Sequence, residues 1–105
     1  MATFTWAKRI TEIGLSFMEE DERKEKVSAL LTTADGKTIL NSKAVSELID
    51  LCASKAGEYL DKHKISTTDA DLIREQLGNI DGATVVAQTN PNELAEWLID
   101  LKASV

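Results

Sequence analysis

Two Asp-Gly pairs, Asp35-Gly36 and Asp81-Gly82, each stand just before an apolar run, and such pairs occur both in calcium loops and in tight turns. A calcium loop of the EF-hand type needs oxygen-bearing side chains at its first, third and fifth positions. Counted from Asp81, the third and fifth positions are Ala83 and Val85, whose side chains cannot coordinate a cation. The carboxylate of Asp35 is isolated and lies close to Lys37. We therefore expect both pairs to be turns rather than metal ligands.

Cys52 and His63 are the only residues of their types, and together they are the usual components of a nucleophilic dyad or part of a zinc site. They lie on one predicted helix, eleven residues apart, which separates them by about 16 Å along the helix axis. That distance excludes a dyad within one chain, and two ligands do not make a zinc site. Cys52 is expected to be a buried core residue, and His63 a cation at the end of a helix.

No other motif in the chain predicts catalysis. Asp69 and Asp71 are two residues apart, so on a helix they point in different directions and serve the helix dipole. The five glycines form none of the spacings that cradle phosphates or expose a nucleophile. We therefore predict a protein that is not an enzyme and uses no metal and no cofactor. An enzyme built from carboxylates with Tyr59 and Arg74 remains the least favoured hypothesis.

The charge is uneven along the chain, whose formal net charge is −6. Residues 1–64 hold eleven acidic and ten basic residues, whereas residues 65–105 hold seven acidic residues and two basic ones. A nucleic-acid partner needs a basic surface, which the second segment lacks, so nucleic acid is excluded as a partner. A protein with a basic surface fits better. The candidate partner-binding residues are Asp69, Asp71, Glu75, Glu93, Glu96 and Asp100.

Length and composition set the class of protein. A chain of 105 residues, 43% hydrophobic and 29% charged, is expected to form a single globular domain over residues 1–105. No apolar run approaches eighteen residues, which predicts no membrane span, and Lys8, Arg9 and Glu12 interrupt any signal-like stretch at the N-terminus. One cysteine allows no internal disulfide, so we expect a cytoplasmic protein.

The first half of the chain predicts a helix followed by a hairpin. Trp6, Ile10, Ile13 and Phe17 fall on one helical stripe, and three acid–base pairs at four-residue spacing over residues 19–26 extend that helix to about residue 25. VSALLTT and KTIL, at 27–33 and 37–40, then form two strands joined through Asp35 and Gly36, where Gly36 adopts a positive φ. The alternative is that the helix continues through this segment.

The second half predicts three helices and a strand. Residues 43–64 form the clearest helix, capped by Asn41 or Ser42, and a Ser-x-x-Asp pattern at 66–69 begins another helix that ends at Gly78. ATVVAQT, at 83–89, is short and β-branched and is predicted to be a buried strand. Asn90-Pro91 begins the last helix.

These elements predict a small α+β domain in the order α-β-β-α-α-β-α, with helices packed on a short sheet. The alternative is an all-α bundle of four to five helices. The favoured function is a non-enzymatic acidic protein-binding module, such as an adaptor, an inhibitor or an antitoxin-like regulator, which occupies a partner's basic surface. The alternative is a structural subunit that assembles into a homo-oligomer, a homodimer in the simplest case, through leftover apolar surface such as Phe4, Trp6 or Leu15.

Overall fold

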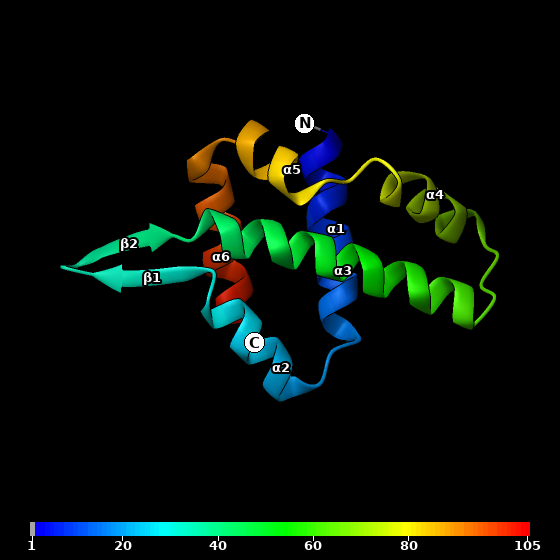
Figure 1. Ribbon diagram of the computed structural model, residues 1–105, viewed down its shortest axis with the longest axis horizontal. Coiled ribbons are helices and arrows are strands. Elements are labelled where there is room, and N and C mark those ends of the chain that lie inside the picture. The colour runs from blue at the N-terminus through cyan, green and yellow to red at the C-terminus, as the bar shows by residue number, and fades with distance from the viewer. Residues whose placement is uncertain (1) are drawn as a thin grey trace.

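The longest helix runs through the middle of the molecule, and the other helices pack around it (Figure 1). The computed structural model describes the backbone of residues 2–105 and the side chains of residues 4–105. Within them lie six helices and one hairpin. They are α1 (Ala2–Ser16), α2 (Glu20–Ser28), β1 (Leu31–Ala34), β2 (Lys37–Leu40), α3 (Ser42–Lys62), α4 (Thr68–Leu77), α5 (Gly82–Gln88) and α6 (Pro91–Ala103).

The central crossing joins α1 to α3. Gly14 of α1 lies directly on the backbone of Cys52, so that a Cβ at position 14 would stand 2.7 Å from the Cys52 carbonyl oxygen. Only glycine permits this approach. Cys52 and Ile10 are fully buried beside it. The small residue therefore allows the two helices to cross with their backbones nearly in contact.

The first helix is shorter than the sequence predicted, and the extension to residue 25 is wrong. α1 ends at Ser16, and the chain reverses before α2 begins at Glu20. The reversal buries Met18 and, at the end of α2, Val27 in the same core cluster. A continuous helix would have carried Val27 away from the core, and the hydrophobic gain from burying both side chains outweighs the few weak ion pairs that favour continuation.

The acid–base pairs of residues 19–26 agree with the conclusion that ion pairs contribute less than burial to the end of the first helix. Only Glu20 and Lys24 form the predicted ion pair, at 3.0 Å, and Lys24 lowers the pKa of the exposed Glu20 carboxyl through a hydrogen bond and its charge. Glu22 lies instead 4.0 Å from Lys55 of α3. Glu19 precedes the helix as its N-cap.

The hairpin prediction is confirmed, with a shorter first strand and the second strand at the predicted residues. Asp35 and Gly36 have φ values of 54° and 75°, as a two-residue turn between antiparallel strands requires. Leu31 pairs with Leu40, and Ala34 pairs with Lys37 next to the turn. The predicted first strand was too long, because Val27 and Ser28 belong to α2. Figure 1 shows the hairpin extending from the helices at one end of the longest axis.

The predicted third strand, at 83–89, is wrong, because these residues form α5. Asp81 caps this helix by accepting a hydrogen bond from the backbone N–H of Thr84 at 3.3 Å. Gly82 packs on the α3 backbone at Ser46, and its N–H donates to Asp50 Oδ1 at 2.7 Å. These contacts hold the segment against α3 and outweigh its β-branched composition, whose intrinsic preference is small and depends on having strands to pair with.

Three other helix starts follow from their sequences. The side chain of Asn41 accepts from Ala44 N at 3.2 Å, and that of Asn90 accepts from Asn92 N at 2.8 Å. Pro91 occupies the first turn of α6. The start of α4 was predicted within one residue, since Thr67, not Ser66, accepts from Ala70 N, at 3.1 Å.

The class is therefore α+β, with two strands instead of three. The larger core cluster is built by α1, α2, α3 and α6 together with Val85 of α5 and Leu31 of β1. A smaller cluster joins Ile10 of α1 and Leu60 of α3 to Ala70 and Ile73 of α4. The sheet reaches the core only through its first residue pair, because the remaining strand residues are exposed.

Candidate protein-binding surface

The last helix carries three of the candidate partner-binding carboxylates on one exposed face. Glu93, Glu96 and Asp100 are spaced by three and four residues, so they lie on the same side of α6. The adjoining side is buried and anchors the helix in the larger core cluster through Leu94, Trp97, Leu98 and Leu101. We call Glu93, Glu96 and Asp100 the acidic face.

The acidic face borders a hollow of about 410 Å³ between α1 and α6. The lining residues are Phe4, Thr5, Lys8, Glu93, Glu96, Trp97 and Asp100. Phe4 and Trp97 meet edge to face, with ring centroids 5.9 Å apart. Lys8 Nζ lies 4.9 Å from the centre of the Phe4 ring. The hollow thus combines two aromatic rings with three carboxylates at its border, and it already holds one cationic side chain against a ring.

The carboxylates of the acidic face are available to a partner. Among the side chains of residues 4–105, none of these three carboxylates forms an ion pair. Glu93 stands in the first turn of α6, where the helix dipole favours its charge. Glu96 and Asp100 lack that support, so a cation placed between them would relieve their mutual repulsion.

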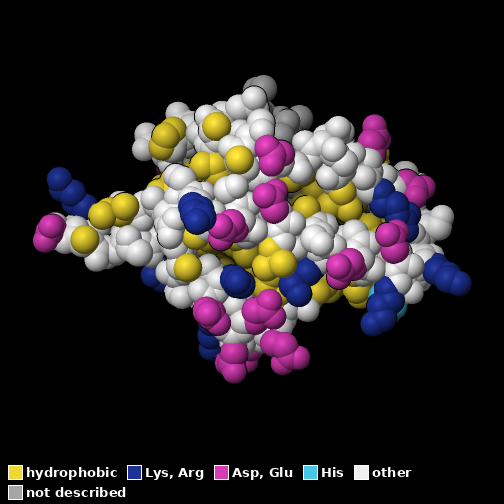
Figure 2. All heavy atoms as spheres, in the orientation of Figure 1, with side chains coloured by type: hydrophobic (Ala, Val, Ile, Leu, Met, Phe, Trp, Pro, Cys, Tyr) yellow, Lys and Arg dark blue, Asp and Glu magenta, His cyan; other side chains and the backbone are white. Residues whose placement is uncertain are grey.

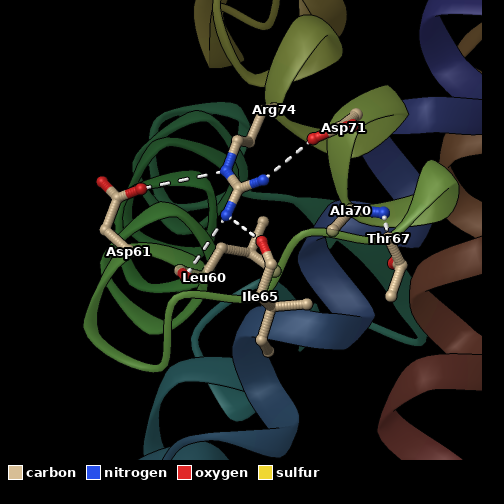
Figure 3. Close-up of polar contacts among 7 residues, drawn as sticks. All are labelled: Leu60, Asp61, Ile65, Thr67, Ala70, Asp71 and Arg74. Carbon is tan, nitrogen blue, oxygen red and sulfur yellow. Dashed lines mark hydrogen bonds and ion pairs between the residues drawn. The ribbon is translucent and has the colours of Figure 1, made fainter.

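The other three candidate residues, Asp69, Asp71 and Glu75, lie on α4. Figure 3 shows that Asp71 takes part in the joint between α3 and α4, where it accepts from Arg74 Nη1 at 3.0 Å. Arg74 Nη2 donates to the backbone oxygens of Leu60 and Ile65, and its Nε lies 3.8 Å from Asp61. Asp71 is therefore engaged within the chain.

The six candidate acids do not form one surface. α4 lies far from α6 along the longest axis of the molecule (Figure 1). Asp69 and Glu75 are exposed on α4 and are separated from the acidic face by α1 and α3. The structure thus gathers three of the six residues at one hollow.

Arg74 is the residue that sequence reasoning missed as a structural element. The sequence suggests for Arg74 only a place in a hypothetical enzyme site, whereas its guanidinium donates to the backbone carbonyls of Leu60 in α3 and Ile65 in the following loop. One signal in the sequence pointed to this role, since Arg74 is the only arginine in residues 65–105 and follows Asp71 by three residues.

Cys52 and His63 lie as the sequence predicted. Cys52 is fully buried, and burial raises the pKa of its thiol to about 12, so it is protonated and unreactive at neutral pH. His63 caps the C-terminus of α3, and its ring lies 4.4 Å from the Tyr59 ring. Tyr59 in turn stacks on the exposed Phe17 at 4.1 Å.

The two Asp-Gly pairs are structural. Asp35-Gly36 forms the hairpin turn, as predicted. The prediction of a turn at Asp81-Gly82 is wrong, because Asp81 caps α5 and Gly82 is the first residue of that helix. In the part of the chain that the structure describes, no group of three or more His, Cys, Asp or Glu side chains is placed to hold a metal ion.

Two predictions about apolar residues are wrong, those on Leu15 and Phe17. Leu15 was expected to be left on the surface, but it is buried. Phe4 is half-buried against Trp97, and Trp6 is half-buried against the smaller core cluster. Phe17, which was placed on the core stripe, is exposed because it follows the end of α1.

The chain has no match among models of known protein families, curated proteins or solved structures. No helix within residues 2–105 is both long and apolar enough to cross a bilayer.

Proposed function

We propose that this chain is a non-enzymatic acidic protein-binding module, an adaptor, inhibitor or antitoxin-like regulator, that binds a basic segment of a partner protein at the acidic face of α6. The observation that carries the proposal is the hollow lined by Phe4, Trp97 and three carboxylates that form no ion pair with any side chain of residues 4–105.

A lysine or arginine side chain suits this hollow chemically. Its aliphatic stem can lie against an aromatic ring while its charged end reaches a carboxylate. Lys8 already shows the first contact within the chain, with Nζ 4.9 Å from the Phe4 ring centre. Because Lys8 rotates about several single bonds, a partner's cation can displace it at low cost.

The overall charge supports the approach of such a partner. A net charge of −6 attracts a basic protein over a distance of about 10 Å at ordinary salt and disfavours nucleic acid. The single, buried cysteine suits a reducing compartment, so the proposed location is the cytoplasm.

Binding of labelled peptides tests the proposal. Peptides rich in lysine or arginine are titrated with the protein, and fluorescence anisotropy is read at about 50 mM and about 200 mM salt. We expect binding that weakens with salt and that changes Trp97 fluorescence. The triple variant Glu93→Lys, Glu96→Lys and Asp100→Lys is expected to bind at least about tenfold more weakly, with little salt dependence.

A second triple variant, Glu12→Lys, Glu25→Lys and Glu58→Lys, is the matched control. It changes the net charge by the same amount at exposed positions on α1, α2 and α3. The proposal requires the control to retain most of the affinity. Equal loss in both variants would show that only net charge matters, and the acidic face would then not be the binding site.

A further inference from the structure

The hairpin is a sheet of two strands, so both β1 and β2 are edge strands. It extends beyond the helices (Figure 1), and its strands are exposed apart from Leu31 and the half-buried Leu40. Two-stranded hairpins are barely stable alone in water, and an unpaired edge is a template for another strand. The hairpin therefore offers backbone groups rather than a side-chain pocket to a partner.

The turn determines which backbone groups point outward. Ala34 and Lys37 close a two-residue turn and so form a hydrogen-bonded pair. Pairs alternate along the ladder, which makes Thr32 and Ile39 the next hydrogen-bonded pair. The N–H and C=O groups of Leu31 and Thr33 on β1 consequently point away from β2 and form the outer edge of the sheet.

The β1 edge lacks the features that normally prevent strand addition. Its sequence, Leu-Thr-Thr-Ala, contains no charged residue and no proline. The β2 edge differs, because it begins with Lys37. Within the hairpin, Ile39 is 51% exposed. Ile99 of α6, which borders one hollow with Thr33 and Thr38, is 52% exposed. Figure 2 shows exposed hydrophobic side chains on the hairpin, beside acidic and basic groups at its tip.

We propose that β1 pairs antiparallel with β1 of a second copy of this chain, forming a four-stranded sheet across a two-fold axis. Residues whose N–H and C=O groups point away from β2 must pair with residues of the same kind in the second copy. Leu31 therefore lies opposite the second copy's Thr33, and each such pair exchanges two backbone hydrogen bonds. Thr32 then lies on the axis, opposite its own copy, and no like charges meet across the strands.

The charges at the hairpin tip also favour a second copy of this chain as the partner of β1. Continuing the register carries the tip of one copy, with Asp35 and Lys37, towards the end of α2 in the other. There Ala29 borders a hollow that is also lined by Lys26 and Glu47, so both signs of charge at the tip meet opposite charges. Two molecules of net charge −6 repel over most of their surfaces, whereas this contact joins an uncharged strand and a mixed tip.

Sedimentation over a concentration series tests the dimer. Thr33→Pro removes an outward N–H without touching the ladder to β2, which an edge strand tolerates, and Thr33→Val keeps that N–H. The wild type and Thr33→Val are expected to dimerise, and Thr33→Pro to have a dissociation constant at least about tenfold higher. A wild type that is monomeric at every concentration, or a Thr33→Pro variant that dimerises equally well, overturns the proposal.

Cross-linking tests the register independently of any proline effect on folding. Thr32→Cys places two thiols opposite each other on the two-fold axis, and it is expected to form a disulfide-linked dimer on mild oxidation. Ile39→Cys is the control on the same face, and its two copies would stand about 14 Å apart across the sheet. Cys52 does not interfere, because it is buried. Faster cross-linking through Ile39→Cys than through Thr32→Cys refutes pairing through β1.

Discussion

At the residue scale, the crossing of α1 and α3 depends on a position that cannot carry a Cβ. A Cβ at Gly14 would stand 2.5 Å from the Cα of Cys52, which is closer than such atoms approach in real proteins. Neither atom can move without its helix, because the backbone fixes the positions of both. The helices would have to move apart and loosen the larger core cluster around them.

Gly14→Ala is therefore expected to lower the free energy of unfolding by about 1–3 kcal/mol, measured by urea denaturation. Gly57→Ala is the matched control, because Gly57 is also inside a helix but a Cβ there would lie 3.5 Å from Leu77 Cδ1, an ordinary contact distance. That variant is expected to be stabilised by about 0.5–1 kcal/mol, since alanine favours the helix. Equal effects of the two substitutions would contradict the close crossing.

The buried thiol of Cys52 is expected to make the free energy of unfolding depend on pH in the alkaline range. Burial raises the pKa of its thiol from 9.0 to about 12. Above about pH 9 the unfolded chain releases the thiol proton while the folded chain keeps it, so unfolding becomes easier as pH rises. Below that pH both states keep the proton and this contribution does not vary.

We expect the difference in unfolding free energy between wild type and Cys52→Ala to shrink by up to about 1.4 kcal/mol per pH unit between pH 9 and pH 12, the limiting slope for one proton. Chemical denaturation of both proteins from about pH 8 upward measures it, and the subtraction removes the effect of other titrating groups. A difference that does not change with pH would mean that the thiol is accessible in the folded state.

At the element scale, the hairpin turn depends on two residues with positive φ, Asp35 and Gly36. Gly36→Val is expected to lower the unfolding free energy by about 1 kcal/mol or more, because a β-branched side chain is strained there. Gly36→Asn is the control, since asparagine tolerates this conformation. Thermal denaturation followed by circular dichroism measures both, and an unchanged midpoint for Gly36→Val would exclude the turn.

The joint between α3 and α4 depends on the planar end of Arg74, which reaches Leu60, Ile65 and Asp71 at once. Arg74→Lys keeps the charge but removes the forked set of donors, leaving a backbone carbonyl without its partner. We expect hydrogen exchange at the α4 amides to accelerate by about tenfold, equivalent to about 1.4 kcal/mol, while exchange at α6 is unchanged. Equal acceleration in α6 would show that Arg74 supports the whole fold rather than this joint.

At the scale of the whole molecule, the two core clusters share α1 and α3 and should unfold together. Trp97 belongs to the larger cluster, and Trp6 packs on the smaller one. Variants that keep a single tryptophan, Trp6→Phe and Trp97→Phe, report each cluster separately by fluorescence. In each variant we expect the fluorescence midpoint in urea to coincide with that from circular dichroism. A separate, earlier transition reported by Trp6 would show that α4 and its cluster unfold alone.

The sequence by itself determined the features that depend on neighbours along the chain. Asn41, Asn90 and Pro91 mark helix starts because a side chain or ring there satisfies or removes backbone donors within the same turn. Asp35-Gly36 marks the hairpin because few other residues accept its dihedral angles. The alternation of Glu93, Glu96 and Asp100 with buried residues placed the acidic face correctly, because helical periodicity is local.

Only the tertiary structure decided the features that depend on distant contacts. ATVVAQ forms part of α5 because Gly82 packs on Ser46 of α3, and no residue pattern within the segment predicts that contact. The chain reversed after Ser16 because burial of Met18 and Val27 outweighs weak ion pairs along a helix surface. The hollow at the acidic face exists because Phe4, near the start of the chain, packs on Trp97 near its end, and no local pattern brings those two residues together.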